Sequence, residues 1–154
     1  MKAPLPTKEQ ASPEALAAVR YKYVLDTDRV ILARGHLDGD GGFLTLIRAM
    51  PRILERFPDA QLVVVGCGPS LPDILSETHK LGVREQTVFP GVVSDEDLAG
   101  LYNCCAVVVA PATHNNHDSA MAQAYGKPTV IVEPDQPAPL ADALIAILAD
   151  PVLA

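Results

Sequence analysis

Apolar residues gather in five short runs along the chain, and polar or glycine-rich segments separate them. A short run of β-branched and aliphatic residues that ends at glycine, proline or polar residues is typical of a buried strand. The five predicted strands are Val30–Ala33, Leu62–Val65, Thr87–Phe89, Ala106–Ala110 and Thr129–Val132. Helical patterns lie between them, so the sequence predicts an α/β fold, a parallel sheet of about five strands with helices on both faces.

The helices are predicted from the spacing of apolar residues and from the residues that begin and end them. Ser12 before Pro13 and Ser94 before acidic residues are typical starts, and Gly82 is a typical end. Pro51 falls inside one helical segment and is expected to kink it or split it in two. The predicted helices are Pro13–Tyr23, Phe43–Phe57, Pro69–Leu81, Ser94–Asn103, Ser119–Tyr125 and Leu140–Leu148.

Length, charge and cysteine count narrow the class of protein. The 154 residues suit one domain; we expect a lead-in with a short helix over 1–28 and the sheet domain over 29–154. A net charge of −7 argues against nucleic-acid or anionic-membrane partners. No apolar run is long enough to span a bilayer, and the N-terminus lacks the core of a signal peptide. Three cysteines, two of them adjacent, favour reduced thiols and a cytoplasmic location.

A glycine-rich turn follows the first predicted strand and carries the main candidate chemistry. Backbone N–H groups of Gly35–Gly42, at the start of a helix, can cradle an anion. The alternative is a tight turn whose glycines only satisfy backbone geometry. Asp38 and Asp40 oppose a bound anion by Coulomb repulsion.

Metal binding is not expected. The acidic turn lacks the spacing of a calcium loop, because position twelve counted from Asp38 is Ala49. The polar stretch His114–Asp118 offers two imidazoles and a carboxylate, but His-x-x-His in a loop is weak evidence for zinc. The simpler interpretations are a solvated turn and a polar loop. We therefore expect no metal site, no resident cofactor and no catalytic set.

Beyond these patterns, several blocks of the sequence match a known family in order and spacing. From about residue 29 the chain resembles the C-terminal, donor-binding domain of GT-B fold retaining glycosyltransferases of the family 4 type. The matching stretches are Gly35–Leu37 with Gly42, Phe57–Pro69, Val88–Leu98, Leu101-Tyr102, Gly126–Val130, and Leu140–Leu144 with Leu148–Pro151. The resemblance implies a doubly wound, Rossmann-like sheet with a nucleotide-diphosphate sugar at the carboxyl ends of its strands. It also implies a second Rossmann-like acceptor domain that normally precedes this one, for which a partner chain is one source.

The chain departs from this family where the donor is normally held. The first loop of the family carries an Arg and a Lys that neutralise the diphosphate; here these positions are His36 and Gly41. Of the two glutamates that contact sugar and ribose, the second falls on Met121 and the first within 113–116, which holds no Glu. A glycine-rich segment and a sixth strand are also missing between Val132 and Leu140.

The resemblance assigns nucleotide contacts to three short segments. They are Gly35, His36, Gly41 and Gly42 in the first loop, Gly91, Val92 and Val93 after the third strand, and Pro111 after the fourth. We expect a glycosyltransferase-like, nucleotide-sugar-binding domain that is inactive alone. The alternatives are a non-catalytic scaffold or homodimerisation module, through an edge or apolar patch left open past the fifth strand, or a trimmed or engineered chain.

Overall fold

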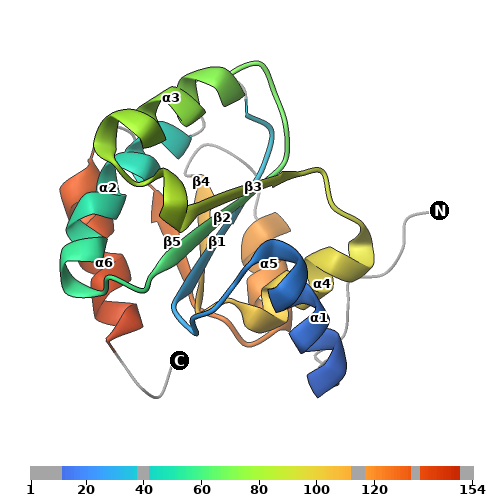
Figure 1. The fold of residues 1–154 in the computed structure, drawn as a ribbon. Helices are drawn as coiled ribbons and strands as arrows, with labels where there is room; N and C mark the ends of the chain where they lie inside the picture. Colours follow the sequence, from blue (N-terminus) through green and yellow to red (C-terminus); the bar gives the residue numbers. More distant parts are fainter. Residues whose placement is uncertain (1–11, 38–41, 112–116, 133–135, 150–154) are drawn as a thin grey trace.

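The computed structural model describes residues 12–37, 42–111, 117–132 and 136–149. Its centre is one parallel sheet in the order β3-β2-β1-β4-β5 (Figure 1). The strands are β1 (Val30–Arg34), β2 (Gln61–Val65), β3 (Thr87–Gly91), β4 (Val107–Pro111) and β5 (Thr129–Val132). The chain moves outward from β1 to β3 and then returns to the other side of β1. The predicted doubly wound, Rossmann-like sheet is confirmed, and its order reverses between β1 and β4.

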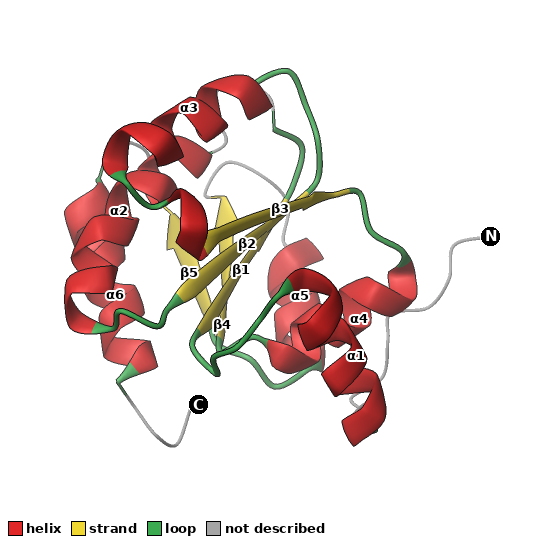
Figure 2. Ribbon diagram, in the orientation of Figure 1, coloured by secondary structure: helices red, strands yellow, loops and turns green. Residues whose placement is uncertain are grey.

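Helices cover both faces of the sheet (Figure 2). One layer consists of α2 (Phe43–Arg56), α3 (Leu71–Leu81) and α6 (Pro137–Leu148), and the other of α1 (Pro13–Tyr23), α4 (Asp95–Cys104) and α5 (His117–Ala124). A short 3₁₀ turn, Arg84–Gln86, precedes β3. Each layer forms its own core with the sheet, the α2-side core and the α1-side core. There are two cores because side chains alternate between the two faces of a strand. Ile31 and Ala33 face the α2 layer, whereas Val30 and Leu32 face the α1 layer.

Two helices differ from the sequence prediction around their prolines. Helix α2 runs through Pro51 as one helix, so of the two predicted outcomes the split does not occur and the kink stays a prediction. Proline removes one hydrogen bond, but seven residues of α2 are buried against the sheet and neighbouring helices, and this burial outweighs the loss. Helix α6 begins at Pro137 rather than Leu140. Proline fits there because first-turn N–H groups have no partner within the helix.

The remaining boundaries lie within a few residues of the prediction. Strand β3 extends to Gly91, and α5 begins at His117 instead of Ser119. Pro111 ends β4, whereas the rest of the predicted polar loop, 112–116, and the acidic turn, 38–41, lie outside the described residues. β5 forms one edge of the sheet, and its Ile131 is 47% exposed. Within the described ranges, no helix has the length and apolar character needed to span a bilayer.

Helix α1 is packed onto the domain rather than standing apart from it. Val19 is buried against α4, where a Cβ added to Gly100 would lie 2.5 Å from Val19 Cγ2. Asp97 on α4 accepts hydrogen bonds from Lys22 Nζ (2.6 Å) and from the Tyr23 hydroxyl (2.7 Å). The predicted domain boundary after residue 28 stays a prediction.

Candidate functional site

The loops at the carboxyl ends of β1, β2 and β3 are joined by main-chain hydrogen bonds. The Gly35 N–H donates to the Val65 carbonyl (3.0 Å), and the Gly66 N–H donates to the Gly91 carbonyl (2.9 Å). Further along, the Leu37 N–H donates to the carbonyl of Cys67 (3.0 Å). The Leu37 carbonyl then accepts from Ser70 N–H (2.8 Å). Backbone groups therefore set the position of the first loop.

Two glycines after β2 make this close approach possible. A Cβ on Gly66 would overlap the Gly35 carbonyl oxygen, and Gly66 has φ +129°, which other residues rarely adopt. A Cβ on Gly68 would overlap the backbone of Leu37. The sequence prediction used Gly66 and Gly68 to mark the end of a strand and as part of the stretch Phe57–Pro69 that matches the family. Their spacing around Cys67 was the available signal, but the backbone they touch comes from a different loop.

Helix α2 begins at this same edge with an unusual start. Its N-cap, Gly42, has φ +83°, makes no side-chain cap and is followed by no acidic residue in the first turn. The Leu46 N–H already donates to the Gly42 carbonyl (3.0 Å). The N-terminus of a helix carries partial positive charge, and within the described residues no side-chain cap hydrogen bond and no carboxylate of the first turn offsets it. Asp38 and Asp40, which we expect to oppose an anion, lie outside the described residues, so anion binding at the α2 start stays a prediction.

The described residues assigned to the nucleotide all lie at the carboxyl edge of the sheet. His36 is exposed in the first loop. Gly91 ends β3 with φ +79°, and Val92 beside it is 76% exposed, whereas Val93 packs partly against the α1-side core. Pro111 ends β4, next to β1 in the sheet. Gly41 lies outside the described residues. The topology brings these segments to one edge, and their nucleotide contacts stay predictions.

Met121, which the resemblance predicts to stand at the position of a family glutamate, belongs to the core. Its side chain is 4% exposed and lies in the α1-side core, which also contains Tyr102 and Tyr125. The rings of the two tyrosines stack with centroids 5.4 Å apart. An apolar thioether packed in this way offers no strong polar contact to a sugar or ribose.

The cysteines differ sharply in environment. Cys104 and Cys105 are buried, and burial raises the pKa of both thiols, that of Cys105 to about 12. The Cys105 thiol donates to the Tyr102 carbonyl (3.3 Å). A thiol that stays protonated is a poor nucleophile and metal ligand. Cys67 is the exposed cysteine of the three. Within the described residues, no group of three His, Cys, Asp or Glu is arranged to hold a metal ion.

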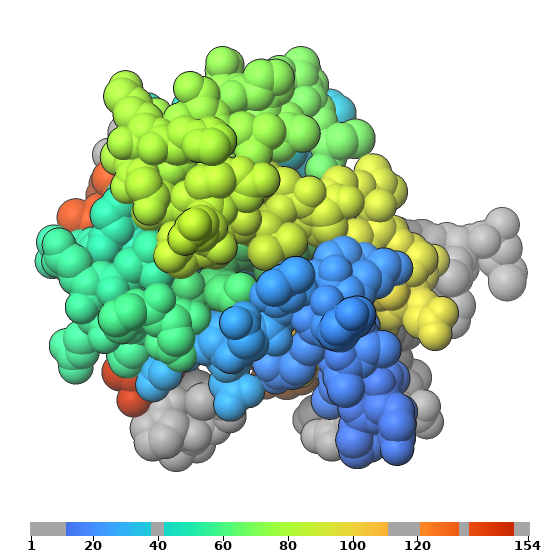
Figure 3. Space-filling view, viewed as in Figure 1, coloured from blue at the N-terminus to red at the C-terminus, as the bar shows by residue number. Residues whose placement is uncertain are grey.

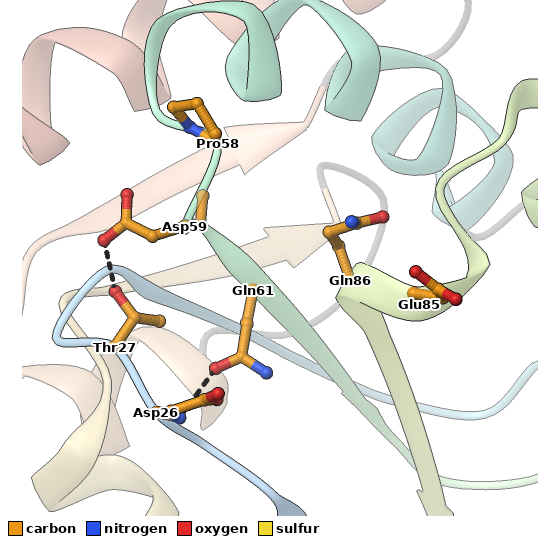
Figure 4. Close-up of a pocket in the computed structure, with 8 residues that line it drawn as sticks. Asp26, Thr27, Pro58, Asp59, Gln61, Glu85 and Gln86 are labelled. Carbon is orange, nitrogen blue, oxygen red and sulfur yellow. Dashed lines mark hydrogen bonds between the residues drawn. The ribbon is translucent and has the colours of Figure 1, made fainter.

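A cavity of about 190 Å³ lies at the opposite, amino edge of the sheet (Figure 4). The Thr27 hydroxyl donates to Asp59 (2.7 Å), and the Asp26 N–H donates to Gln61 Oε1 (3.0 Å). The hydrogen bond from Thr27, followed by that from Arg29, lowers the pKa of Asp59. The cavity lining is Asp26, Thr27, Pro58, Asp59, Ala60, Gln61, Glu85 and Gln86. The side chains of Thr27, Asp59 and Gln61 are thus used within the protein, whereas Gln86 Oε1 is buried without a hydrogen-bond partner. The cavity lies between elements, away from the carboxyl edge.

Comparison with known proteins agrees with this geometry. The family model "Glycosyl transferases group 1" matches residues 28–133. An uncharacterized glycosyltransferase of Methanocaldococcus jannaschii is 38% identical over 110 residues, which cover 70% of this chain and 28% of the relative. A GDP-mannose-dependent α-(1-6)-phosphatidylinositol monomannoside mannosyltransferase of Mycolicibacterium smegmatis is 33% identical over 99 residues, 64% of this chain and 26% of the relative. The chain thus spans about a quarter of the length of these curated relatives.

Two solved structures share the fold. HepE from Anabaena, in complex with UDP and glucose, superposes with a TM-score of 0.81 at 17% identity, over 95% of this chain and 45% of that protein. The C-terminal domain of a group 1 glycosyl transferase, LpcC from Francisella tularensis, superposes with a TM-score of 0.79 at 18% identity, over 99% of this chain and 90% of that domain. The chain therefore belongs to the group 1 glycosyltransferases and has the fold of the C-terminal domain of GT-B enzymes.

Proposed function

We propose that this domain binds the nucleotide diphosphate of a nucleotide sugar at the carboxyl edge of its sheet. The observation that carries the proposal is the start of α2, which within the described residues has no side-chain cap hydrogen bond and no first-turn carboxylate and stands beside loops held by main-chain hydrogen bonds. Diphosphate binds well to such a helix N-terminus. The complexes of HepE with UDP and with UDP-glucose support the same ligand class.

In this proposal the base lies against the backbone of Gly91–Val93. Main-chain N–H and C=O groups keep their hydrogen-bonding capacity whatever the side chain, so this part of the site tolerates sequence change. Gly91 has open space around its Cα, and the neighbouring Val92 is largely exposed. A flat ring can approach such a surface closely.

We propose further that the isolated domain does not transfer sugar. Transfer of a sugar from a diphosphate requires groups that stabilise the negative charge of the leaving diphosphate. His36 and Gly41 stand where the family has Arg and Lys, and the buried Met121 stands where it has a glutamate. The acceptor side would have to come from further chain or a partner protein.

Calorimetric titration with UDP, GDP and ADP, each with and without Mg²⁺, tests the binding proposal. We expect saturable binding of one nucleotide, which would identify the base. Absence of binding by all three at millimolar concentration contradicts it. Release of free sugar from UDP-glucose or GDP-mannose by the purified chain contradicts the proposed inactivity.

A gain-of-function variant sharpens this test. His36→Arg places a guanidinium in the first loop, where a charge-assisted hydrogen bond to phosphate should tighten nucleotide binding about tenfold. His79→Arg is the matched control, because His79 is also exposed but lies in the last turn of α3. Equal effects of both variants would show only a gain in net charge and would count against the proposed site.

A further inference from the structure

Helix α1 presents apolar residues on both of its sides. On the inner side Val19 is buried, and Leu16 and Tyr23 pack partly against the same core. On the outer side Ala17, Ala18 and Tyr21 are exposed. A surface helix normally has polar residues on its outer side. The outer side of α1 therefore has the character of a surface that another protein covers.

Two residues make this outer side unusual. Tyr21 is 89% exposed, and Val24, directly after the helix, is 70% exposed. Val24 also has φ +59°, a left-handed conformation that β-branched residues rarely adopt. Neither side chain gains much from burial in the isolated chain. Figure 3 shows the α1 segment (blue) on the surface beside the α4 segment (yellow).

The distribution of charge and size along α1 favours a second copy of the same helix as the partner. Glu14 lies in the first turn and Lys22 in the last, four residues on either side of Ala18. If two copies of α1 cross antiparallel near Ala18, each Glu14 stands opposite Lys22 of the partner subunit. The small side chains of Ala17 and Ala18 allow the helix backbones to approach closely. Such an arrangement is isologous, as in most homodimers.

Lys22 is available for this second contact. Its Nζ donates to Asp97 (2.6 Å), and its side chain is still 61% exposed. An ammonium group has three N–H donors, so one bond to Asp97 leaves others for another carboxylate. The hydrogen bonds of Lys22 and Tyr23 to Asp97 also fix the end of α1 on α4. The helix is thus held firmly with its outer side outward.

We propose that the chain forms an antiparallel homodimer through the outer side of α1, with Tyr21 packed across the crossing and Glu14 paired with Lys22 of the partner subunit. The helix has 11 residues, and two such helices bury less than the roughly 1,600 Å² of a standard stable interface. The dimer is therefore weak and depends on concentration. It is independent of nucleotide binding at the carboxyl edge.

Sedimentation velocity or light scattering over a range of concentrations tests the proposal. The mass of the wild-type chain should rise from monomer toward dimer between about 10 µM and about 500 µM, the range of a weak interface. Tyr21→Ala should weaken the dimer about tenfold and leave the thermal midpoint unchanged, because the side chain is exposed in the monomer. A monomer at all concentrations overturns the proposal.

A charge swap identifies the interface. Glu14→Lys alone, and Lys22→Glu made together with Asp97→Asn so that the new carboxylate does not face Asp97, bring like charges together at both contacts, and each should stay monomeric. An equimolar mixture of the two variants brings opposite charges together at both contacts and should restore the dimer. Lys80→Glu, an exposed position on α3, controls for net charge, and circular dichroism confirms folding. The proposal is contradicted if every variant still forms a dimer, for example through the β5 edge. It is also contradicted if the mixture of the two variants fails to associate.

Discussion

The two edges of the sheet are held together by different kinds of contact. At the amino edge, hydrogen bonds from side chains join the segments. Arg20 donates to the Thr27 carbonyl and to Asp28, and Asp59 accepts from Thr27 and Arg29. At the carboxyl edge, the loops after β1, β2 and β3 are held by main-chain hydrogen bonds, and Gly66 and Gly68 supply the close contacts.

This difference is the reason for placing the proposed nucleotide at the carboxyl edge. Polar side chains that satisfy one another, as Thr27 and Asp59 do, have little capacity left for a bound molecule. At the carboxyl edge the side chains of His36 and Val92 are exposed, and α2 begins at Gly42 without a side-chain cap hydrogen bond. Binding residues are often found on loops that a rigid scaffold positions. The amino edge provides stability, and the carboxyl edge provides the surface for the proposed nucleotide.

The largest predicted effect comes from breaking the main-chain contacts at the carboxyl edge. Gly66→Ala should lower the free energy of unfolding by about 3 kcal/mol or more, because the added Cβ overlaps the Gly35 carbonyl and φ is +129°. Gly91→Ala should cost only about 1 kcal/mol, since its φ of +79° is strained but the space is open. Urea denaturation of both variants measures the difference. Equal losses would show that overlap with Gly35 is unimportant.

A smaller effect is expected from the side-chain contacts at the amino edge. Thr27→Val keeps the shape but removes the hydroxyl that donates to Asp59 and accepts from the Arg29 N–H (3.0 Å). The variant should be less stable by about 1–2 kcal/mol, because partly buried partners lose hydrogen bonds. Nucleotide titration of the same variant should be unchanged. Loss of nucleotide binding without loss of stability would contradict the separation of the two edges.

Acid should weaken the amino edge through Asp59. Its folded pKa lies below the ordinary 3.8, chiefly because Thr27 donates to the carboxylate. A lowered folded pKa stabilises the fold above the unfolded value, and this contribution is lost as pH falls through the folded value. Between pH 5 and pH 2, Asp59→Asn should therefore lose less stability than the wild type, as measured by denaturation midpoints. Identical slopes would exclude Asp59 as a contributor.

The smallest predicted effect is a gain in stability beside the amino edge. Val24→Gly relieves a left-handed β-branched residue that is 70% exposed, while its carbonyl can still accept from Gln61 Nε2 (2.9 Å). Glycine also increases the entropy of the unfolded chain, so the net gain should be about 0.5 kcal/mol. Thermal melts should show a slightly higher midpoint. Val24→Ala relieves less of the strain and should fall in between.

Most of the fold could be predicted from sequence because strands and helices of this chain differ in local pattern. Thr129–Val132 has the predicted bounds, and Ser12 and Ser94 cap their helices through bonds to Ala15 N–H and Asp97 N–H. The split predicted as one outcome at Pro51 does not occur, because the local cost of proline is visible in the sequence, whereas the packing that outweighs it is not.

The candidate site was less accessible to sequence reasoning. The glycines that hold its first loop lie after β2, about thirty residues further along the chain, and only the sheet brings them to Gly35. Met121 was identified as a lost glutamate position, but its burial beside Tyr125 came from the packing of α5. Contacts between distant segments depend on which strands are neighbours, and local patterns carry little of that information.

The sequence alone determined the order of strands and helices and the family, because these depend on local pattern and residue identity; the replaced donor contacts stay a prediction. The tertiary structure decided which glycines lie against another loop's backbone, which helix begins at Gly42 without a side-chain cap hydrogen bond, and which side of α1 faces outward. Those properties arise when parallel strands align their ends and two helical layers bury one side of each helix. They depend on contacts between distant residues, which exist only in the folded chain.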